Sequence, residues 1–265
     1  MNYIKSAGKI LLYLLIYYGF QLLFFLILGV DALLKGLSNT EMESYIYKNS
    51  GLMMILSMII SLIIYFFILR NKENNVFKRY NFKNIGIKNI MLIIVICISF
   101  SMILSGIVEY VIKFFPSYNE TSKMISMSMN SILGILAVLL FAPIFEEILF
   151  RGMVLGEIKN KVNITAAIII QGVLFGIYHM NLFQSIYAGV LGILLGFICV
   201  KAGSIVGSII AHITFNICGS TVLPYLVELS GKFAFLYIIA GVLIFIISLY
   251  KFNRCNILNR NGIYD

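Results

Sequence analysis

The sequence predicts an all-α membrane protein, a polytopic bundle of about eight transmembrane helices. Of its 265 residues 61% are hydrophobic and only 12% are charged, and the mean hydropathy is +0.99. These values lie outside the usual range for soluble globular domains. Apolar runs long enough to cross a hydrocarbon core of about 30 Å follow one another with short polar interruptions. One helical bundle therefore accounts for the chain, and no soluble domain fits in the gaps.

Three spans are expected before the residues that could carry chemistry. The first run is long and lacks a small-residue cleavage pattern, so we interpret it as a retained span and not as a signal peptide. The third run contains one acid, Glu109, which lies within a turn of Lys113 and is assigned to the membrane interface. These spans are predicted at Ile10–Leu28, Leu52–Leu69 and Ile90–Ile112.

Five further spans are expected in the second half. The fourth begins near Ile132, carries two glutamates and continues towards Ile158. Glycines four residues apart in the fifth and sixth spans would let these helices pack closely (Gly172 and Gly176, Gly192 and Gly196). The last four spans are predicted at Ile164–His179, Ile186–Val200, Ser204–Leu223 and Phe233–Tyr250. The chain thus divides into N-terminal helices (1–131), a core (132–223) and a last helix with a basic tail (224–265).

Basic residues in the loops predict the topology. The loop from residue 70 to 88 carries six basic residues against one acid, Glu73: Arg70, Lys72, Lys78, Arg79, Lys83 and Lys88. With this loop in the cytoplasm, fifteen Lys and Arg residues lie inside and five outside, so both termini are expected in the cytoplasm. The basic residues behind the net charge of +9 therefore lie in loops and termini, where they set the topology. Nucleic acid is not expected as a partner. The bias towards Ile, Asn and Lys suggests an AT-rich bacterial genome.

Two adjacent acids, Glu146 and Glu147, lie inside the fourth span. A charge near the centre of a bilayer costs at least about 2.5–3.5 kcal/mol, so both carboxylates must face protein groups or trapped water. Arg151 follows Glu147 by four residues and shares its helix face, whereas Glu146 is rotated from Glu147 by about 100°. We expect Glu147 and Arg151 to form a structural pair, which leaves Glu146 in a different environment.

The only histidines, His179 and His212, also lie in predicted spans, and Asn216 shares a helix face with His212. A rise of about 1.5 Å per residue allows Glu146 and both imidazoles to meet at mid-membrane. A carboxylate could act as general base on water, one histidine could orient that water, and the other with an asparagine could stabilise an oxyanion. These residues indicate hydrolysis or an ion relay. A zinc site formed by Glu146, His179 and His212 remains open.

Other hydrolytic sites can be excluded from the residues. There is no His-Glu-x-x-His helix, because Met180 follows His179 and Ile213 follows His212. The only aspartates, Asp31 and Asp265, lie outside the spans, so an aspartyl dyad is absent. No Gly-x-Ser-Gly segment offers a nucleophilic serine. The four cysteines have neither metal-ligand spacing nor the pattern of a disulfide framework.

Three motifs resemble one family of intramembrane proteases. The segments Glu146-Glu147-x-x-x-Arg151, Phe175-x-x-x-His179 and His212-x-x-x-Asn216, in this order, are similar to those of the CAAX-protease and bacteriocin-processing family (CPBP, also called Abi). The resemblance covers about Ile132 to Leu223 and includes Gly152 and the turn from Lys201 to Ile205. It implies an eight-helix bundle that acts as an endopeptidase.

The resemblance also implies roles for the motif residues. Glu146 would activate water with help from His179, and His212 and Asn216 would form the oxyanion site. Glu147 and Arg151 would brace the helix, and Phe175 would support the site. We expect a mechanism without a cofactor, although zinc remains the alternative.

The expected substrate is a membrane-associated peptide or protein, such as a bacteriocin or pheromone precursor, and not a prenylated protein. Two other functions stay open at this point. One is a non-proteolytic scaffold for bacteriocin self-immunity or regulation, and the other is a proton or cation transporter.

Overall fold

The computed structural model describes residues 2–70, 82 and 84–255, and regular structure in these residues is helical throughout. Of the predicted basic loop, Lys72, Lys78, Arg79 and Lys83 lie outside the described residues. The predicted all-α membrane bundle is confirmed. Seven helical segments of the described chain are long and apolar enough to span a membrane.

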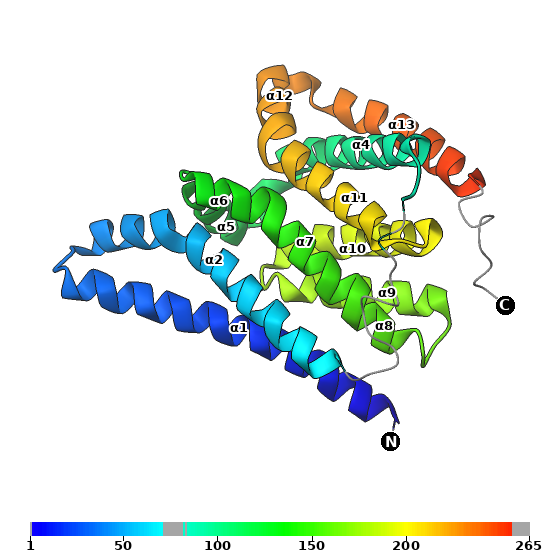
Figure 1. The fold of residues 1–265 in the computed structure, drawn as a ribbon. Helices are drawn as coiled ribbons and strands as arrows, with labels where there is room; N and C mark the ends of the chain where they lie inside the picture. The colour runs from blue at the N-terminus through cyan, green and yellow to red at the C-terminus, as the bar shows by residue number, and fades with distance from the viewer. Residues whose placement is uncertain (1, 71–81, 83, 256–265) are drawn as a thin grey trace.

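Two long helices form an antiparallel hairpin at one side of the molecule, α1 (Asn2–Leu34) and α2 (Asn39–Leu69) (Figure 1). Both extend beyond the predicted spans, because much of the polar segment after Asp31 remains helical. Asp31 accepts a hydrogen bond from Lys35 at 2.6 Å, and the backbone N–H of Ser38 donates to Glu41 at 2.9 Å. The second contact belongs to a capping box that starts α2.

The fourth predicted span is one continuous helical segment from Ile132 to Ile158, which contains two π-helical stretches. Pro143 lies in the first turn of α7 and has no N–H to donate, which is one reason why the preceding turn departs from α-helical bonding. π-Helical turns are frequent at functional sites. The consecutive segments are α6 (Ile132–Leu136), η2 (Ala137–Phe141), α7 (Ala142–Glu147), η3 (Ile148–Val154) and α8 (Leu155–Ile158).

The remaining elements complete the bundle. The fifth predicted span is the exception in length, because α9 has 15 residues and measures about 22 Å, short of a bilayer core of about 30 Å. The bounds of these remaining elements are α4 (Ile87–Val111), η1 (Ile112–Phe114), α5 (Pro116–Ser128), α9 (Ile164–Tyr178), α10 (Leu182–Ala202), α11 (Ile205–Ile217), η4 (Cys218–Val222), α12 (Leu223–Ser230), η5 (Gly231–Phe233) and α13 (Phe235–Arg254).

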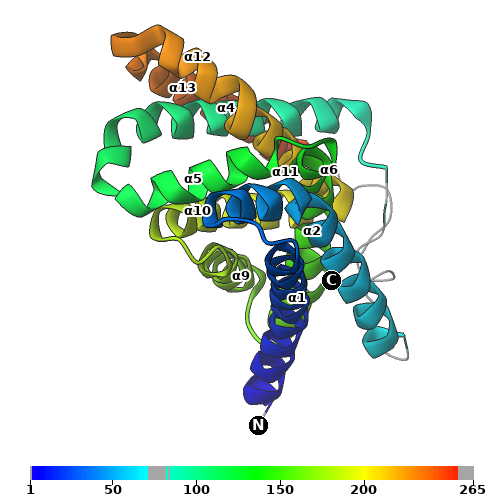
Figure 2. The same ribbon diagram turned by 90° about the vertical axis from the view of Figure 1, so that its left-hand side faces the viewer.

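The helices pack in layers, with α7 between the α1–α2 hairpin and the pair α10–α11, and with α4 and α13 farthest from α1 (Figure 1). Figure 2 shows the same order from the side, with α1 opposite α4 and α13. The predicted close packing of the fifth and sixth spans is confirmed. A Cβ atom on Gly172 would lie 2.8 Å from the backbone nitrogen of Ile193. Because Gly172 has no side chain, α9 can lie this close to α10.

Contacts near the ends of helices group the predicted cytoplasmic segments at one end. Lys9 pairs with Glu157 at 3.1 Å, and the hydroxyl of Tyr3 donates to the carbonyl of Lys161 at 3.2 Å. At the other end the amide of Asn181 donates to the hydroxyl of Thr121 at 3.1 Å. This grouping agrees with the expected topology, and the assignment of one end to the cytoplasm stays a prediction.

Candidate active site

The two glutamates of α7 occupy different environments, as their rotation around the helix predicts. The side chain of Glu147 is fully buried, whereas that of Glu146 is 12% exposed. On either side of this pair lie the π-helical segments η2 and η3. The site is therefore centred on a partly exposed acid, beside an acid that the protein encloses.

Glu147 forms the expected pair with Arg151. The Nη1 of Arg151 donates to Glu147 Oε1 at 2.8 Å, and both side chains are fully buried. The Nη2 of Arg151 donates to the carbonyl of Gly192 on α10 at 2.9 Å. Because a buried charge must be paired and hydrogen-bonded, these contacts hold the Glu147 carboxylate in one place and tie α7 and η3 to α10.

His212 contacts both acids. Its Nδ1 lies 2.9 Å from Glu147 Oε1, and its Nε2 lies 3.7 Å from Glu146 Oε2. A carboxylate that accepts from an arginine is ionised and has no proton to give, so the shorter contact is an N–H donated by His212. Glu147 thereby fixes the orientation of the imidazole, and the second nitrogen faces Glu146.

His179 directly follows α9, at the end of the helix that the sequence predicts. Its Nδ1 donates to the carbonyl of Phe175 at 2.8 Å, because a carbonyl oxygen can only accept. In the neutral imidazole the Nε2 is then an acceptor. The next residue, Met180, has a φ of 54°, which is uncommon for a residue other than glycine. The chain therefore turns sharply immediately after His179.

Phe175 lies among these polar groups. Its ring centroid is 4.9 Å from that of His179 and 5.7 Å from that of His212, both edge-on. The Arg151 guanidinium lies 4.7 Å from the same centroid, a cation–π distance. This buried ring thus contacts both imidazoles and the Arg151 guanidinium, and its supporting role stays a prediction.

Asn216 lies one turn beyond His212 on α11, as its spacing predicts. Its Nδ2 donates to the carbonyl of Val138 in the π-helical segment η2 at 3.0 Å. The amide has a second N–H and an oxygen that this contact does not use. Asn216 therefore connects α11 to η2 and has one N–H that can serve another acceptor.

The alternative zinc ligands are not gathered as a metal site. Among the described residues, no group of three or more His, Cys, Asp and Glu side chains is placed to hold a metal ion. His212 and His179 each direct Nδ1 to a protein acceptor, Glu147 and the carbonyl of Phe175, and each keeps Nε2 for another partner. In the described part of the chain, Glu146, His179 and His212 therefore do not form such a group.

Sequence reasoning missed one buried polar residue, Gln171. Its Nε2 donates at 2.8 Å to the carbonyl of Gly192, the same oxygen that Arg151 contacts. Gln171 is fully buried in α9. The side-chain amide of Gln171 stands out in the apolar run that begins at Ile164, so a buried hydrogen bond could have been predicted. Its partner could not, because a backbone carbonyl has no signature in the sequence.

Sequence reasoning also missed the contribution of α1. The ring of Tyr17 lies 4.5 Å from that of Phe145, the neighbour of Glu146. Tyr18 donates a hydrogen bond to the carbonyl of Tyr178, the neighbour of His179. The first helix therefore packs against the residues that precede Glu146 and His179. Nothing in its composition distinguishes it from an ordinary span.

The site thus combines a partly exposed carboxylate with two imidazoles and an amide inside an apolar bundle. Such a set can move protons to and from water and can stabilise developing negative charge.

Comparisons with known proteins agree with this chemistry. Residues 128–218 match the family described as type II CAAX prenyl endopeptidase Rce1-like, and this segment contains all three motifs. The "Putative membrane peptidase YdiL" of Bacillus subtilis (strain 168) is 29% identical over 118 residues, which are 44% of this chain and 48% of the relative. The chain thus spans about half the length of the curated relative that it matches. No solved structure matches the chain.

Proposed function

We propose that this membrane protein is an intramembrane endopeptidase, because its residues 128–218 match the Rce1-like type II CAAX prenyl endopeptidase family. It hydrolyses a peptide bond in a membrane-associated peptide or protein, such as a bacteriocin or pheromone precursor. The observation that carries the proposal is the position of His212 between the two glutamates, 2.9 Å from Glu147 and 3.7 Å from Glu146. A purely structural ion pair would not need a second, partly exposed acid beside it.

Glu146 is the proposed general base. Its carboxylate accepts a proton from water, and the hydroxide adds to the carbonyl carbon of the scissile bond. When the C–N bond breaks, the leaving amine takes the proton from Glu146, so the carboxylate is restored and one water is consumed. His179 assists this step, because the Nε2 of its neutral imidazole accepts a hydrogen bond from the attacking water.

His212 and Asn216 are the proposed oxyanion donors. The Nδ1 proton of His212 is used by Glu147, so its Nε2 donates to the oxyanion in the doubly protonated form, with the two glutamates as counter-charges. Asn216 supplies the N–H that Val138 does not use. Removal of one such donor costs typically 10²–10³-fold in rate.

Glu147, Arg151 and Phe175 are the proposed positioning residues. All three are fully buried. Glu147 and Phe175 contact His212 and Arg151 pairs with Glu147, so they position His212 and do not touch the substrate. The protein resides in a bacterial cell membrane, and we propose that both termini face the cytoplasm, as the distribution of basic residues predicts.

The proposal is tested by comparing membrane proteomes and secreted peptides of cells that carry the wild-type protein or Glu146→Gln. We expect a precursor to accumulate uncleaved with the variant, at equal protein levels in the membrane. Alanine at His179 and at His212 provides the second arm. If both leave the cellular phenotype intact, a scaffold function replaces the endopeptidase. If Glu146→Gln still cleaves, Glu146 is not the base.

A further inference from the structure

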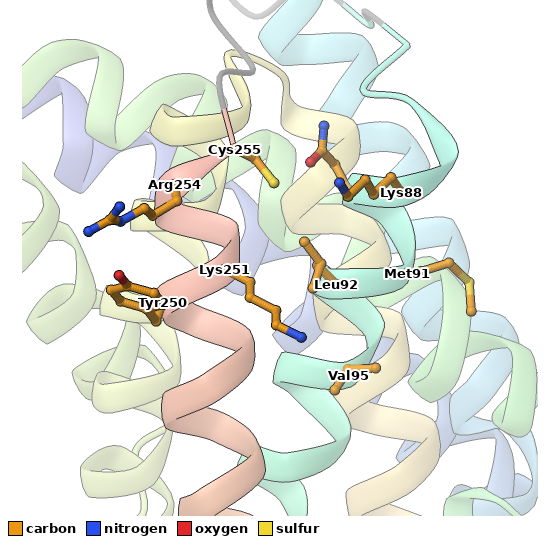
Figure 3. A pocket seen from close by; sticks show the side chains of 9 residues that line it. Lys88, Met91, Leu92, Val95, Tyr250, Lys251, Arg254 and Cys255 are labelled. Atoms are coloured by element: carbon orange, nitrogen blue, oxygen red, sulfur yellow. The ribbon is translucent and has the colours of Figure 1, made fainter.

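The ends of α4 and α13 enclose a cavity that the proposed reaction does not use. Its volume is about 1040 Å³, and it lies between the first turns of α4 and the last turns of α13 (Figure 3). Both helices are candidate membrane spans, from Ile87 and up to Arg254. The cavity is therefore located where these spans leave the bilayer, at the end that the basic residues assign to the cytoplasm.

The polar part of the cavity is basic. Three of its lining residues are cationic and exposed: Lys88, Lys251 and Arg254. Lys251 extends from α13 towards α4, whereas Arg254 points to the other side of α13 and lies over the ring of Tyr250 at 4.9 Å (Figure 3). No acid is found among the described residues that line the cavity. A negatively charged group between Lys88 and Lys251 would meet no carboxylate from these described residues.

The position of Lys88 adds to this positive potential. Lys88 lies in the first turn of α4, which contains no acid. The N-terminal end of a helix carries partial positive charge, so a cation is unfavourable there and an anion is favourable. Lys251 across the cavity adds like charge. The arrangement is stabilised if an anion occupies the space between these two side chains.

The deeper wall of the cavity is apolar. Met91, Leu92 and Val95 follow Lys88 on α4, and Val95 lies about 10 Å further along the helix axis. Beyond this wall the two helices approach closely, because a Cβ atom on Gly241 would lie 2.9 Å from the carbonyl oxygen of Ser99. The cavity thus has a cationic end at the membrane surface and an apolar wall that leads towards the hydrocarbon.

We propose that this cavity binds an anionic phospholipid. The phosphate would lie between Lys88 and Lys251, and an acyl chain would follow Leu92 and Val95. Basic pockets between transmembrane helices on the cytoplasmic side are suited to anionic headgroups. A zwitterionic lipid would bring an ammonium group among the cations, and a soluble phosphate would leave the apolar wall uncovered.

The test uses the absence of tryptophan from the chain. Met91, which lines the cavity and is 55% exposed, is replaced in Met91→Trp as a single fluorophore. The full-length protein is reconstituted in vesicles with brominated phosphatidylglycerol or brominated phosphatidylcholine as the quencher. We expect the anionic lipid to quench several-fold more effectively. Lys88→Gln with Lys251→Gln should abolish this preference, since each cation contributes roughly fivefold near an anionic surface.

The matched control removes two cations next to the opposite ends of α4 and α13, Lys113→Gln in η1 with Lys232→Gln in η5. It should leave the preference unchanged, and all variants should unfold at the wild-type temperature. Equal quenching by both lipids in the wild type would overturn the proposal. So would a preference that survives in the Lys88–Lys251 variant, or one that the control abolishes. Displacement of the lipid by millimolar inorganic phosphate would assign the cavity to a soluble anion instead.

Discussion

The Nδ1 of His212 on α11 donates to Glu147 Oε1 on α7 at 2.9 Å, and the same oxygen accepts from Arg151 at 2.8 Å. One carboxylate oxygen thus connects the histidine to the buried ion pair. Glu146, one residue earlier, faces the other nitrogen of the same imidazole. Each acid therefore lies near a different nitrogen of His212, Glu147 at Nδ1 and Glu146 at Nε2.

Breaking the buried pair should destabilise the protein more than removing both partners. Arg151→Met leaves Glu147 buried without its cation, so we expect a loss of about 3–5 kcal/mol in the free energy of unfolding. The double variant Glu147→Gln with Arg151→Met should lose less than the sum of the single variants. Reversible unfolding in mixed detergent micelles measures all four proteins. Additive losses would show that the two side chains do not interact.

Asparagine at position 212 should separate structure from activity. Its amide can reproduce the Nδ1 donor that contacts Glu147, but it has no group at the position of Nε2. We expect His212→Asn to remain closer to wild-type stability than His212→Ala and to lose at least about 10²-fold in kcat. Thermal unfolding and cleavage kinetics test this expectation on the same preparations. Wild-type turnover by His212→Asn would remove Nε2 from the mechanism.

Gln171 should act as a positioning residue through the carbonyl of Gly192. Gln171→Met removes one of the two donors to this oxygen and leaves Arg151 in place. We expect a loss of about 1 kcal/mol in stability and a decrease in kcat of less than about tenfold. KM should stay unchanged, because Gln171 is buried away from the substrate. Gln184→Met is the matched control, since that amide lies on α10 and does not contact Gly192. A change in KM without a change in kcat would contradict the assignment.

Chelators should leave the cleavage rate unchanged. Among the described residues, no three histidines, cysteines or acids are placed together to hold a metal ion. The assay compares protein dialysed against a chelator with the same sample after Zn²⁺ is returned. Loss of activity that Zn²⁺ restores would establish a metal-dependent mechanism and would reassign Glu146, His179 and His212 as ligands.

Much of the fold could be predicted from the sequence, because apolar length and charge distribution determine where helices cross a membrane. The spacing of four residues also placed Glu147 with Arg151 and His212 with Asn216, since helix geometry is local. Helix ends were predicted less well. The first two spans were predicted to end at Leu28 and to begin at Leu52, yet α1 and α2 continue beyond these limits, where Lys35 pairs with Asp31.

Other parts of the site depend on tertiary contacts and have no local signature. The π-helical turns beside the glutamates depend on backbone register as well as on Pro143. The carbonyl of Gly192 becomes a ligand of Arg151 and Gln171 only when α9, α10 and η3 meet. Tyr17 and Tyr18 on α1 likewise reach Phe145 and Tyr178 through long-range packing.

The most direct test of the account is the cleavage rate of purified Glu146→Gln in vesicles, with the precursor that accumulates in cells as the substrate. Glutamine retains the size of the side chain but cannot accept the proton of water, and a general base contributes typically 10²–10⁴-fold. We expect kcat to fall by at least this factor, with wild-type stability and substrate binding. Turnover within about threefold of the wild type would contradict the assignment of Glu146 as the base.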